Sequence, residues 1–396
     1  MSLLLEGVRI LAISQFGAGP FASMMLAELG AEIIKIEDPS VGGDVSRSVP
    51  PYNLEGDSLY FQSFNRNKKS ITLNLKSSEG QQIFHRLVKV SHAVFNNLRG
   101  DQVAKLGLDY AALQKVNPRI VCCSLSGFGT TGERASEPGY DYLMQAFTGY
   151  MSMTGDPSAP PATCGVSVID HAAGFAAALG LVAALYSAEK TGVGRNVEVS
   201  LIDTAVSMLT YLAIWNLNKG FKPVRRPGSA HQTLVPVQTF QTQDSHIVLF
   251  CAKEKFWQEL CVAMGVPRMA TDERFKNFPA RHENREATVA AVQNILLTKT
   301  TSEWLQLLRG KVPCAPVNDL AQALSDPFLQ EREMIVETQH PVFGKVKQVG
   351  GPFKVSEAEV CHHRAPTMGE HTAQVLKDYL GYDEQQIEAL SKKRIV

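Results

Sequence analysis

The chain has 396 residues, with 39 basic and 39 acidic side chains, so its formal net charge is zero. Hydrophobic residues make up 44% and charged residues 20% of the chain, which excludes an intrinsically disordered protein. The balanced charge argues against nucleic acid or an acidic membrane surface as the main partner, and the length favours two domains.

The seven cysteines form no CxxC pair, and the first residues lack the basic region and cleavage site of a signal peptide. No apolar stretch reaches the roughly 20 residues that a membrane span needs. The run Cys361-His362-His363 lacks metal-ligand spacing and is interpreted as an exposed turn. We therefore expect a reduced, cytoplasmic protein without metal, disulfides or a membrane partner.

Strand and helix patterns alternate along the first third of the chain. Expected strands span residues 7–14, 31–37, 70–75, 93–95 and 119–125, with helices after Pro20, over 79–90 and over 110–116. This alternation predicts an open α/β sheet with parallel strands and right-handed crossovers.

Residues 172–188 read AAGFAAALGLVAALYSA, which predicts a helix that is buried on every face. Asp170 stands at its entrance. A carboxylate there is commonly a helix N-cap, and the alternative is a nucleophile at the mouth of a buried core. The sequence around Asp170 leaves both interpretations open.

The order of predicted strands and helices changes after this helix. The patterns predict a strand at 196–200, a helix at 201–213, a basic Gly/Pro-broken loop at 219–229, a hairpin at 235–251, and helices at 255–264, 286–297 and 302–308. A second hairpin around residues 340–349 and helices at 371–380 and 384–390 follow. The middle block therefore resembles a separate α+β domain.

Two groups of residues indicate a nucleotide ligand. Gly17-x-Gly19-x-x-Ala22 follows a strand, and Glu37 ends the next strand, as in dinucleotide-binding proteins, so an NAD-dependent dehydrogenase is one hypothesis. Cations and amides in successive loops would suit several phosphates; they are Arg47, Asn65, Arg66, Asn67, Lys68, Lys69, Lys76, Asn97, Arg99 and Lys105.

Longer motifs run through the whole chain in a distinctive order. They include LEGVRIL, AGPFA, LGAEIIKIE, NRNKKSITLNLK, NPRIVCCSLSGFGTTG, PGYD, VPCAPVND, GPFK and RAPTMGEHT. In this order they resemble the class III CoA-transferases, the CaiB/BaiF-like family, and within it the branch that uses dicarboxylates.

The resemblance implies an interlocked homodimer of α/β chains. Each chain would have a Rossmann-like large domain over 1–215, a smaller α+β domain over 225–325, and a C-terminal segment over 326–396 that returns to the large domain. The substrates would be an acyl-CoA, such as succinyl-CoA, and a carboxylic acid such as glutarate, itaconate or a malate-type acid.

The resemblance also implies roles for individual residues. Asp170 aligns with the catalytic nucleophile, which would pass through aspartyl anhydride and aspartyl-CoA thioester intermediates, with helix N–H groups keeping it ionised. Coenzyme A contacts are implied at Phe16, Gly17, Ala18, Leu73, Lys76, Asn97, Leu98, Arg99, Lys105, Tyr140 and Asp141.

A dicarboxylate needs a second anion site, for which Arg47, Arg66 and His231 are candidates, and a loop over Gly228–Gln232 would form a lid. The family segment NFRPG is Asn97-Leu98-Arg99-Gly100-Asp101 here, without its proline. An acyl-CoA racemase of the same superfamily and a non-catalytic CoA-binding protein remain alternatives to the transferase.

Overall fold

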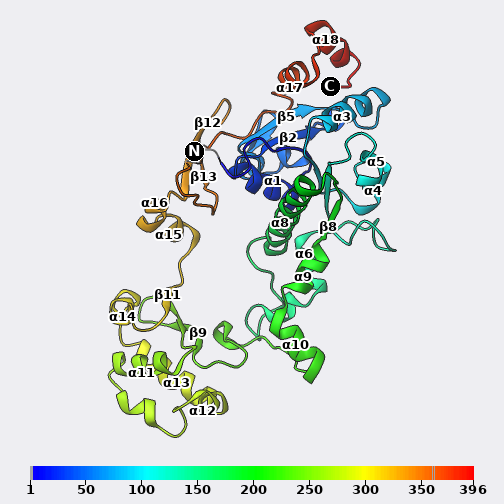
Figure 1. Ribbon diagram of the computed structural model, residues 1–396. Coiled ribbons are helices and arrows are strands. Elements are labelled where there is room, and N and C mark those ends of the chain that lie inside the picture. The colour runs from blue at the N-terminus through cyan, green and yellow to red at the C-terminus, as the bar shows by residue number, and fades with distance from the viewer. Residues whose placement is uncertain (1–2, 359, 361) are drawn as a thin grey trace. The chain divides into compact units, whose positions relative to one another are not determined.

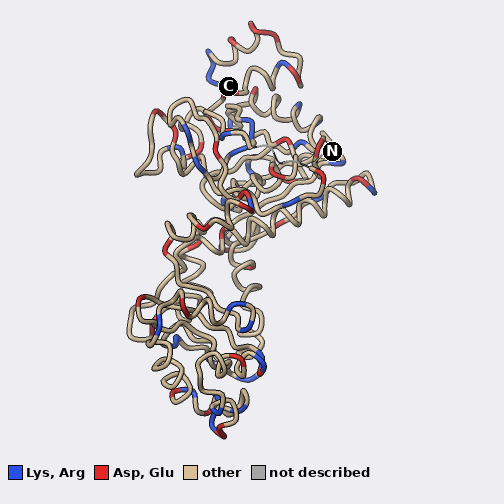
Figure 2. The backbone as a smooth tube through the Cα atoms, turned by 90° about the vertical axis from the view of Figure 1, so that its left-hand side faces the viewer, with Lys and Arg blue, Asp and Glu red and all other residues tan. Residues whose placement is uncertain are grey.

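The computed structural model describes residues 3–358, 360 and 362–396, and it divides into two compact units. The first unit comprises Met1–Thr148, Gly165–Leu209 and Pro327–Val396, and the second comprises Gly149–Cys164 and Thr210–Asp326. Lys and Arg are interspersed with Asp and Glu along both units (Figure 2). The charge balance of the sequence therefore does not arise from two units of opposite charge.

The first unit is built on a six-stranded sheet in which every neighbouring pair is parallel. Its strands are β1 (Arg9–Ile13), β2 (Glu32–Glu37), β5 (Lys68–Thr72), β6 (Ala93–Asn96), β7 (Val121–Ser126) and β8 (Asn196–Ser200). The spatial order is β5-β2-β1-β6-β7-β8. Strands β2 and β5 are added on one side of β1, and β6, β7 and β8 on the other, so the strand order reverses between β1 and β6. The predicted parallel sheet is confirmed. In open α/β sheets, ligands bind where the strand order reverses in this way.

Helices and two small hairpins complete the first unit. The helices are α1 (Ala18–Glu28), α2 (Leu59–Asn65), α3 (Ser78–Lys89), α4 (Gly100–Lys105), α5 (Tyr110–Leu113), α6 (Asp141–Phe147), α8 (Val168–Thr191), α9 (Leu201–Ser207), α16 (Pro327–Glu331), α17 (Thr372–Leu380) and α18 (Glu384–Lys392). The hairpins pair β3 (Asn53–Leu54) with β4 (Asp57–Ser58), and β12 (Ile335–His340) with β13 (Gly344–Val349).

The C-terminal helices belong to the core of the first unit. Val375 and Leu376 of α17 are buried in one cluster with Ile71 of β5 and Phe84 of α3. Figure 1 shows α17, in red, beside β5 and α3. Apolar residues from opposite ends of the chain therefore close one edge of the sheet.

Helix α8 is 24 residues long, seven more than the expected 17. Gly174 allows a close approach to α1, because a Cβ atom there would lie 2.8 Å from the Phe21 ring and 3.0 Å from the Ala18 carbonyl oxygen. The face with Ala177 and Leu181 packs into the first unit. By length and composition alone α8 could cross a membrane, and core helices of α/β domains share this property.

The opposite face of α8 carries large apolar residues that the chain leaves exposed. Phe175, Leu179 and Tyr186 are 42%, 73% and 67% exposed. The prediction that α8 is buried on every face is therefore wrong for the single chain. Composition shows that a face is apolar, but it does not show which molecule covers it.

The second unit has a three-stranded antiparallel sheet, in the order β11 (Cys314–Pro316), β10 (His246–Phe250), β9 (Val237–Gln241). Its helices are α7 (Tyr150–Met153), α10 (Thr210–Lys219), α11 (Glu254–Ala263), α12 (Phe278–Glu283), α13 (Arg285–Leu296), α14 (Thr301–Leu308) and α15 (Leu320–Leu324). The core forms around the fully buried Trp257 and Trp304.

The boundaries of the units differ from the expected domains in two places. Residues 149–164 and 210–215, expected in the large domain, belong to the second unit. Arg225 holds the first of these segments by donating to the Asp156 carbonyl oxygen at 3.1 Å. The expected single helix over 201–213 is two helices, because Thr210 adopts a φ of 42° where the chain enters the second unit.

Candidate active site

A cavity of about 640 Å³ lies in the first unit, where the loops after β1, β6 and β7 meet. Seven residues predicted to contact substrate line it, namely Phe16, Ala18, Asn97, Leu98, Arg99, Tyr140 and Asp170. The cavity therefore coincides with the reversal in strand order between β1 and β6, and it brings together residues as far apart in the sequence as Gln15 and Leu201.

The loops after β1 and β6 are joined by one amide side chain. Asn97 accepts from the Gln15 N–H at 2.9 Å and donates to the Gln15 carbonyl at 2.8 Å. Gly19 permits this approach, because a Cβ atom there would lie 2.6 Å from the Asn97 Cγ. Gly19 of the dinucleotide-binding pattern therefore makes room for the Asn97 side chain of the protein, and not for a nucleotide.

Phe16 projects from a strained turn beside this bridge. Its φ is 64°, in the left-handed region, and its N–H donates to Asp44 at 3.2 Å. Asp44 is buried and forms an ion pair of 2.7 Å with Lys35. The buried ion pair therefore holds the turn in its conformation.

Asp170 is the third residue of α8 and does not cap the helix. Asp141 does so from α6, since one of its oxygens accepts from the Ile169 N–H at 2.7 Å and from the Asp170 N–H at 3.2 Å. The other oxygen of Asp141 accepts from Gln145 at 2.5 Å. The N-cap interpretation is therefore wrong for Asp170, and the capping role belongs to Asp141.

The Asp170 carboxylate lies against the backbone of the β1 loop. A Cβ atom at Gly17 would lie 3.2 Å from Asp170 Oδ2 and 3.7 Å from the Tyr60 hydroxyl. Any side chain at position 17 would therefore crowd the carboxylate. Tyr60 comes from α2, and nothing in the local sequence marked it as a neighbour of Asp170.

The electrostatic surroundings favour the protonated form of Asp170. Burial raises the pKa of Asp170 to about 7, and the negative charge of Asp141 adds to this increase. Burial also raises the pKa of Tyr60, with contributions from the charges of Asp170 and Asp44. The expectation that helix N–H groups keep Asp170 ionised is not met, because Asp141 already occupies those groups.

Arg47 and Arg66, the expected anion-binding residues, are buried and already paired. Arg47 donates two hydrogen bonds to Glu37, at 2.8 and 2.7 Å, and lies over the Phe61 ring. Arg66 donates to Glu28 at 2.5 Å and to the Val349 carbonyl at 2.7 Å. Neither guanidinium group lines the cavity around Asp170.

The remaining cations expected at coenzyme A lie at the surface. Lys105 and Arg99 share the carboxylate of Asp101, at 2.6 and 2.5 Å, and Lys76 lies 3.1 Å from Asp38. Leu73 is buried in the core of the first unit. Of these residues only Arg99 lines the cavity.

The expected lid residues belong to the second unit. Gly228 has a φ of 65°, and Gln232 bonds to both backbone groups of Val224. His231 Nδ1 accepts from the N–H groups of Thr233 and Leu234, at 3.1 and 3.0 Å. A ring nitrogen that accepts two hydrogen bonds carries no proton, so this imidazole is neutral.

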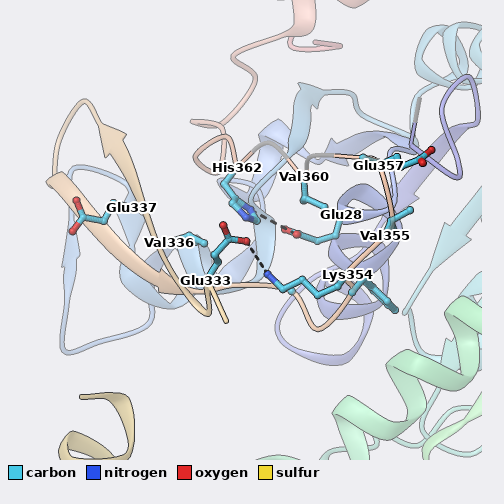
Figure 3. Close-up of a pocket in the computed structure, with 12 residues that line it drawn as sticks. Glu28, Glu333, Val336, Glu337, Lys354, Val355, Glu357, Val360 and His362 are labelled. Carbon is cyan, nitrogen blue, oxygen red and sulfur yellow. Dashed lines mark hydrogen bonds and ion pairs between the residues drawn. The ribbon is translucent and has the colours of Figure 1, made fainter. Parts of the chain in front are cut away.

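A second cavity, of about 760 Å³, lies in the first unit among acidic side chains (Figure 3). Glu28 lies 3.6 Å from His362 there, and Lys354 pairs with Glu333 at 3.1 Å. Its lining has more carboxylates than cations, which disfavours the phosphates of coenzyme A. The smaller cavity around Asp170 is therefore the better candidate for the active site.

Among residues 3–358, 360 and 362–396, no group of three or more His, Cys, Asp or Glu residues is arranged to hold a metal ion. Cys361, part of the expected exposed turn, lies outside the described residues.

The family model for CoA-transferase family III matches residues 5–372. The chain belongs to this family. The resemblance to the CaiB/BaiF-like proteins is thereby confirmed, and Glu37 fits the result. In a dehydrogenase its carboxylate would bind a ribose, whereas here it accepts from Arg47, from Ser70 at 2.6 Å and from the Asp44 N–H at 3.0 Å.

Individual proteins of known name or structure are also similar to this chain. A succinyl-CoA:glutarate CoA-transferase of Mus musculus is 35% identical over 98% of this family III chain and 88% of its own. A succinate–glutarate CoA-transferase of Agrobacterium fabrum is 34% identical over 94% and 95%. The crystal structure of a CaiB/BaiF family protein from Brucella suis superposes with a TM-score of 0.82, at 31% identity over 96% and 100%.

Proposed function

We propose that this family III CoA-transferase moves coenzyme A from succinyl-CoA to a dicarboxylic acid such as glutarate, itaconate or a malate-type acid, with Asp170 as the nucleophile. The names of two relatives support the substrates. The observation that carries the proposal is that Asp170 lines the cavity with a carboxylate that caps no helix, while Asp141 performs that structural task.

The reaction would begin with attack of the Asp170 carboxylate on the thioester carbonyl of the donor. The C–S bond breaks, giving an aspartyl–acyl anhydride and the thiolate of coenzyme A. The thiolate then attacks the aspartyl carbonyl and expels the donor acid, which leaves an aspartyl-CoA thioester. The acceptor carboxylate repeats these two steps in reverse order, so the thioester is exchanged and not hydrolysed.

Two features of the cavity suit this chemistry. Because the pKa of Asp170 is near 7, a large fraction is ionised at neutral pH and the carboxylate is more basic than an ordinary aspartate. The Tyr60 hydroxyl keeps its proton because its pKa is raised, so it can donate to an oxyanion beside Gly17.

Coenzyme A would occupy the cavity over Asn97, Leu98 and Arg99, with its phosphates toward the surface. Arg99 and Lys105 share Asp101, so a phosphate would replace that carboxylate as their partner. A loop over Gly228–Gln232 would exclude water, which would otherwise hydrolyse both covalent intermediates.

The exposed face of α8 supports an interlocked homodimer. A soluble chain rarely leaves a row of residues such as Phe175, Leu179 and Tyr186 open to water. The chain passes between the units four times, near residues 148–149, 164–165, 209–210 and 326–327, and such passages would let one chain thread through another. We therefore expect a cytoplasmic homodimer without nucleic acid or membrane partners.

The decisive experiment incubates the protein with succinyl-CoA and a panel of acids, glutarate, itaconate, malate and oxalate, and identifies new acyl-CoA thioesters by mass. Glutaryl-CoA or a related product should form with the wild type and disappear with Asp170→Ala. Asp383→Ala is the matched control, because it removes a carboxylate at the start of α18, in the same unit. Normal transfer by Asp170→Ala would overturn the mechanism.

An acyl-CoA racemase of the same superfamily is the alternative activity. Racemisation needs an acid and a base that exchange protons with the substrate. Asp141, the nearest candidate partner of Asp170, is already hydrogen-bonded through both oxygens. Loss of chirality in a 2-methylacyl-CoA without an acceptor acid would favour the racemase, and release of the acid without any exchange would favour neither.

A further inference from the structure

A buried ion pair supports the loop that joins β1 to α1. Lys35 and Asp44 lie 2.7 Å apart, and their side chains are 0% and 1% exposed. Lys35 Nζ also donates to the Ser14 carbonyl oxygen, and Asp44 Oδ1 accepts from the Phe16 N–H at 3.2 Å. The two partners therefore hold the backbone of the loop on both sides of Gln15.

Asp44 is itself fixed by neighbours that do not line the cavity around Asp170. Its Oδ1 accepts from the Ser46 N–H at 2.9 Å and from the Ser46 hydroxyl at 2.7 Å, and its own N–H donates to Glu37 at 3.0 Å. Lys35 and Asp44 do not line the cavity either. The ion pair therefore contacts the site through the loop that it holds.

The loop places Gly17 directly beside Asp170. Phe16, which precedes this glycine, has a φ of 64°, a conformation that a residue with a side chain keeps only when its surroundings support it. A Cβ atom at Gly17 would lie 3.2 Å from Asp170 Oδ2, so the backbone and the carboxylate are in close contact. A displacement of about 1 Å at this contact is enough to cost a reaction roughly 100-fold in rate.

Stability alone does not explain why this ion pair is buried. Two charges that leave water lose their hydration, and apolar residues of similar volume commonly give a protein of equal or greater stability. A buried ion pair can instead fix one arrangement of the chain. The arrangement that Lys35 and Asp44 fix contains the left-handed Phe16 and the contact between Gly17 and Asp170.

We infer that Lys35 and Asp44 are positioning residues for the transfer reaction, which hold the turn at Phe16 and Gly17 against the carboxylate of Asp170. The inference rests on the proposed function, in which Asp170 is the nucleophile. Because neither residue of the pair lines the cavity, their loss should lower kcat more than it raises KM.

The test replaces both members of the pair, so that neither charge is left without the other. Lys35→Met/Asp44→Leu should lower kcat for the formation of glutaryl-CoA from succinyl-CoA about 10- to 100-fold, and leave the KM for glutarate within about threefold. Lys35→Met/Asp44→Asn keeps an oxygen for the Phe16 N–H and should recover part of kcat. Equal kcat values for the two double variants, or a loss confined to KM, would overturn the assignment.

A second buried ion pair of the same unit provides the matched control. Arg66 and Glu28 lie 2.5 Å apart, with both side chains 2% exposed, and neither lines the cavity. Arg66→Met/Glu28→Leu should keep kcat within about twofold of the wild type. A loss as large as that of Lys35→Met/Asp44→Leu would show that kcat responds to any buried pair, and the inference would fail.

A milder variant covers the case in which Lys35→Met/Asp44→Leu does not fold. Ser46→Ala removes one donor to Asp44 and leaves both charges in place. It should lower kcat about two- to fivefold, since one hydrogen bond that fixes Asp44 is lost. A fully active Ser46→Ala protein together with a fully active Lys35→Met/Asp44→Asn protein would refute the positioning role.

The charge of Asp170 gives a measurement that needs no turnover. Burial is the larger cause of the raised pKa of Asp170, and Asp141 is the smaller one, while the Tyr60 hydroxyl lies beside the same turn. A released turn admits water to the carboxylate, which lowers this pKa. Asp44 also contributes to the raised pKa of Tyr60, but that hydroxyl stays protonated at pH 8 with or without the charge of Asp44.

Urea denaturation at pH 5 and pH 8 reads out this change. The stability that Asp170→Asn gains between the two pH values should be smaller in the Lys35→Met/Asp44→Leu background than in the wild type, and unchanged in the Arg66→Met/Glu28→Leu background. An equal gain in all three backgrounds would overturn the inference. If the gain shrinks as expected but the wild type forms no glutaryl-CoA, the proposed function fails while the support of Asp170 by the turn stands.

Discussion

Both units contain arginines whose guanidinium groups reach into the protein, and these arginines differ in what they meet. In the first unit Arg47 and Arg66 bind Glu37 and Glu28 within 2.8 Å, and in the second unit Arg281 lies 2.8 Å from Glu254. Arg226 and Arg285, also in the second unit, meet carbonyl oxygens, or no acceptor, among the described residues. Burial alone therefore does not show whether an arginine is neutralised by a carboxylate.

Breaking the ion pair between Arg47 and Glu37 should give the largest effect on stability. Arg47→Met leaves Glu37 as a buried carboxylate without its bidentate partner, so we expect the free energy of unfolding to fall by about 3–5 kcal/mol. Urea denaturation of the full chain measures the loss. The double variant Arg47→Met/Glu37→Leu should recover part of it, because Glu37 no longer remains as an unpaired charge, whereas the buried Asp57 still lacks Arg47 at 3.5 Å.

The same variant distinguishes a structural from a binding role for Arg47. A structural role requires that the remaining folded protein keeps a KM for glutarate near that of the wild type. Unchanged stability together with a large increase in that KM would instead make Arg47 the dicarboxylate site, and the contrast with the unpaired arginines would fail.

Asp170 should give the next largest effect, because no cation among the described residues compensates its largely buried charge. Its pKa is about 7 in the folded chain and near 3.8 when unfolded, so the folded state binds the extra proton in the intervening range. Its contribution to stability is therefore lost as the pH rises from 4 to 7. Asp170→Asn should gain on the order of 2 kcal/mol over the wild type between pH 5 and pH 8.

Urea denaturation at the two pH values checks this prediction, with Asp383→Asn as a control for an exposed carboxylate at a helix start. The control should show little difference between pH 5 and pH 8. An equally flat result for Asp170→Asn would mean that a cation compensates Asp170 in the folded protein.

Removing the charge of Asp141 should have a smaller effect, on the pH dependence of the activity that depends on Asp170. Asp141→Asn keeps an oxygen for the Ile169 and Asp170 N–H groups and removes the negative charge. Because burial is the larger cause of the raised pKa, the acidic limb of kcat/KM should move down by only about half to one pH unit. An unmoved limb at unchanged stability would assign the whole shift to burial.

Sequence patterns predict the parallel sheet well because strand, turn and helix signals are local. Seven residues that line the cavity had been indicated by the family resemblance, and they come together because the loops after β1, β6 and β7 meet at one edge of a parallel sheet. The capping role of Asp141 was not, because a cap that comes from another helix leaves no local signal. Tyr60 was missed for the same reason.

Charged residues were the least predictable class. Arg47, Arg66, Arg226 and Arg285 look alike in the sequence, and only the fold decides which of them meets a carboxylate. Arg47, in the segment after β2, finds Glu37 at the end of that strand, and Arg66, directly after α2, finds Glu28 at the end of α1. The sequence therefore offered Arg47, Arg66 and His231 as anion-binding candidates, and the structure shows that both of these arginines already have carboxylate partners.

The smallest expected effect is on the stability of Arg226→Gln in buffer without carboxylates or phosphate. Arg226 has no partner to lose and repels Arg285, so the free energy of unfolding should stay within about 0.5 kcal/mol of the wild type or rise slightly. Arg225→Gln, its neighbour, should lose about 1 kcal/mol, because Arg225 donates to the carbonyl oxygens of Asp156 and Ala159.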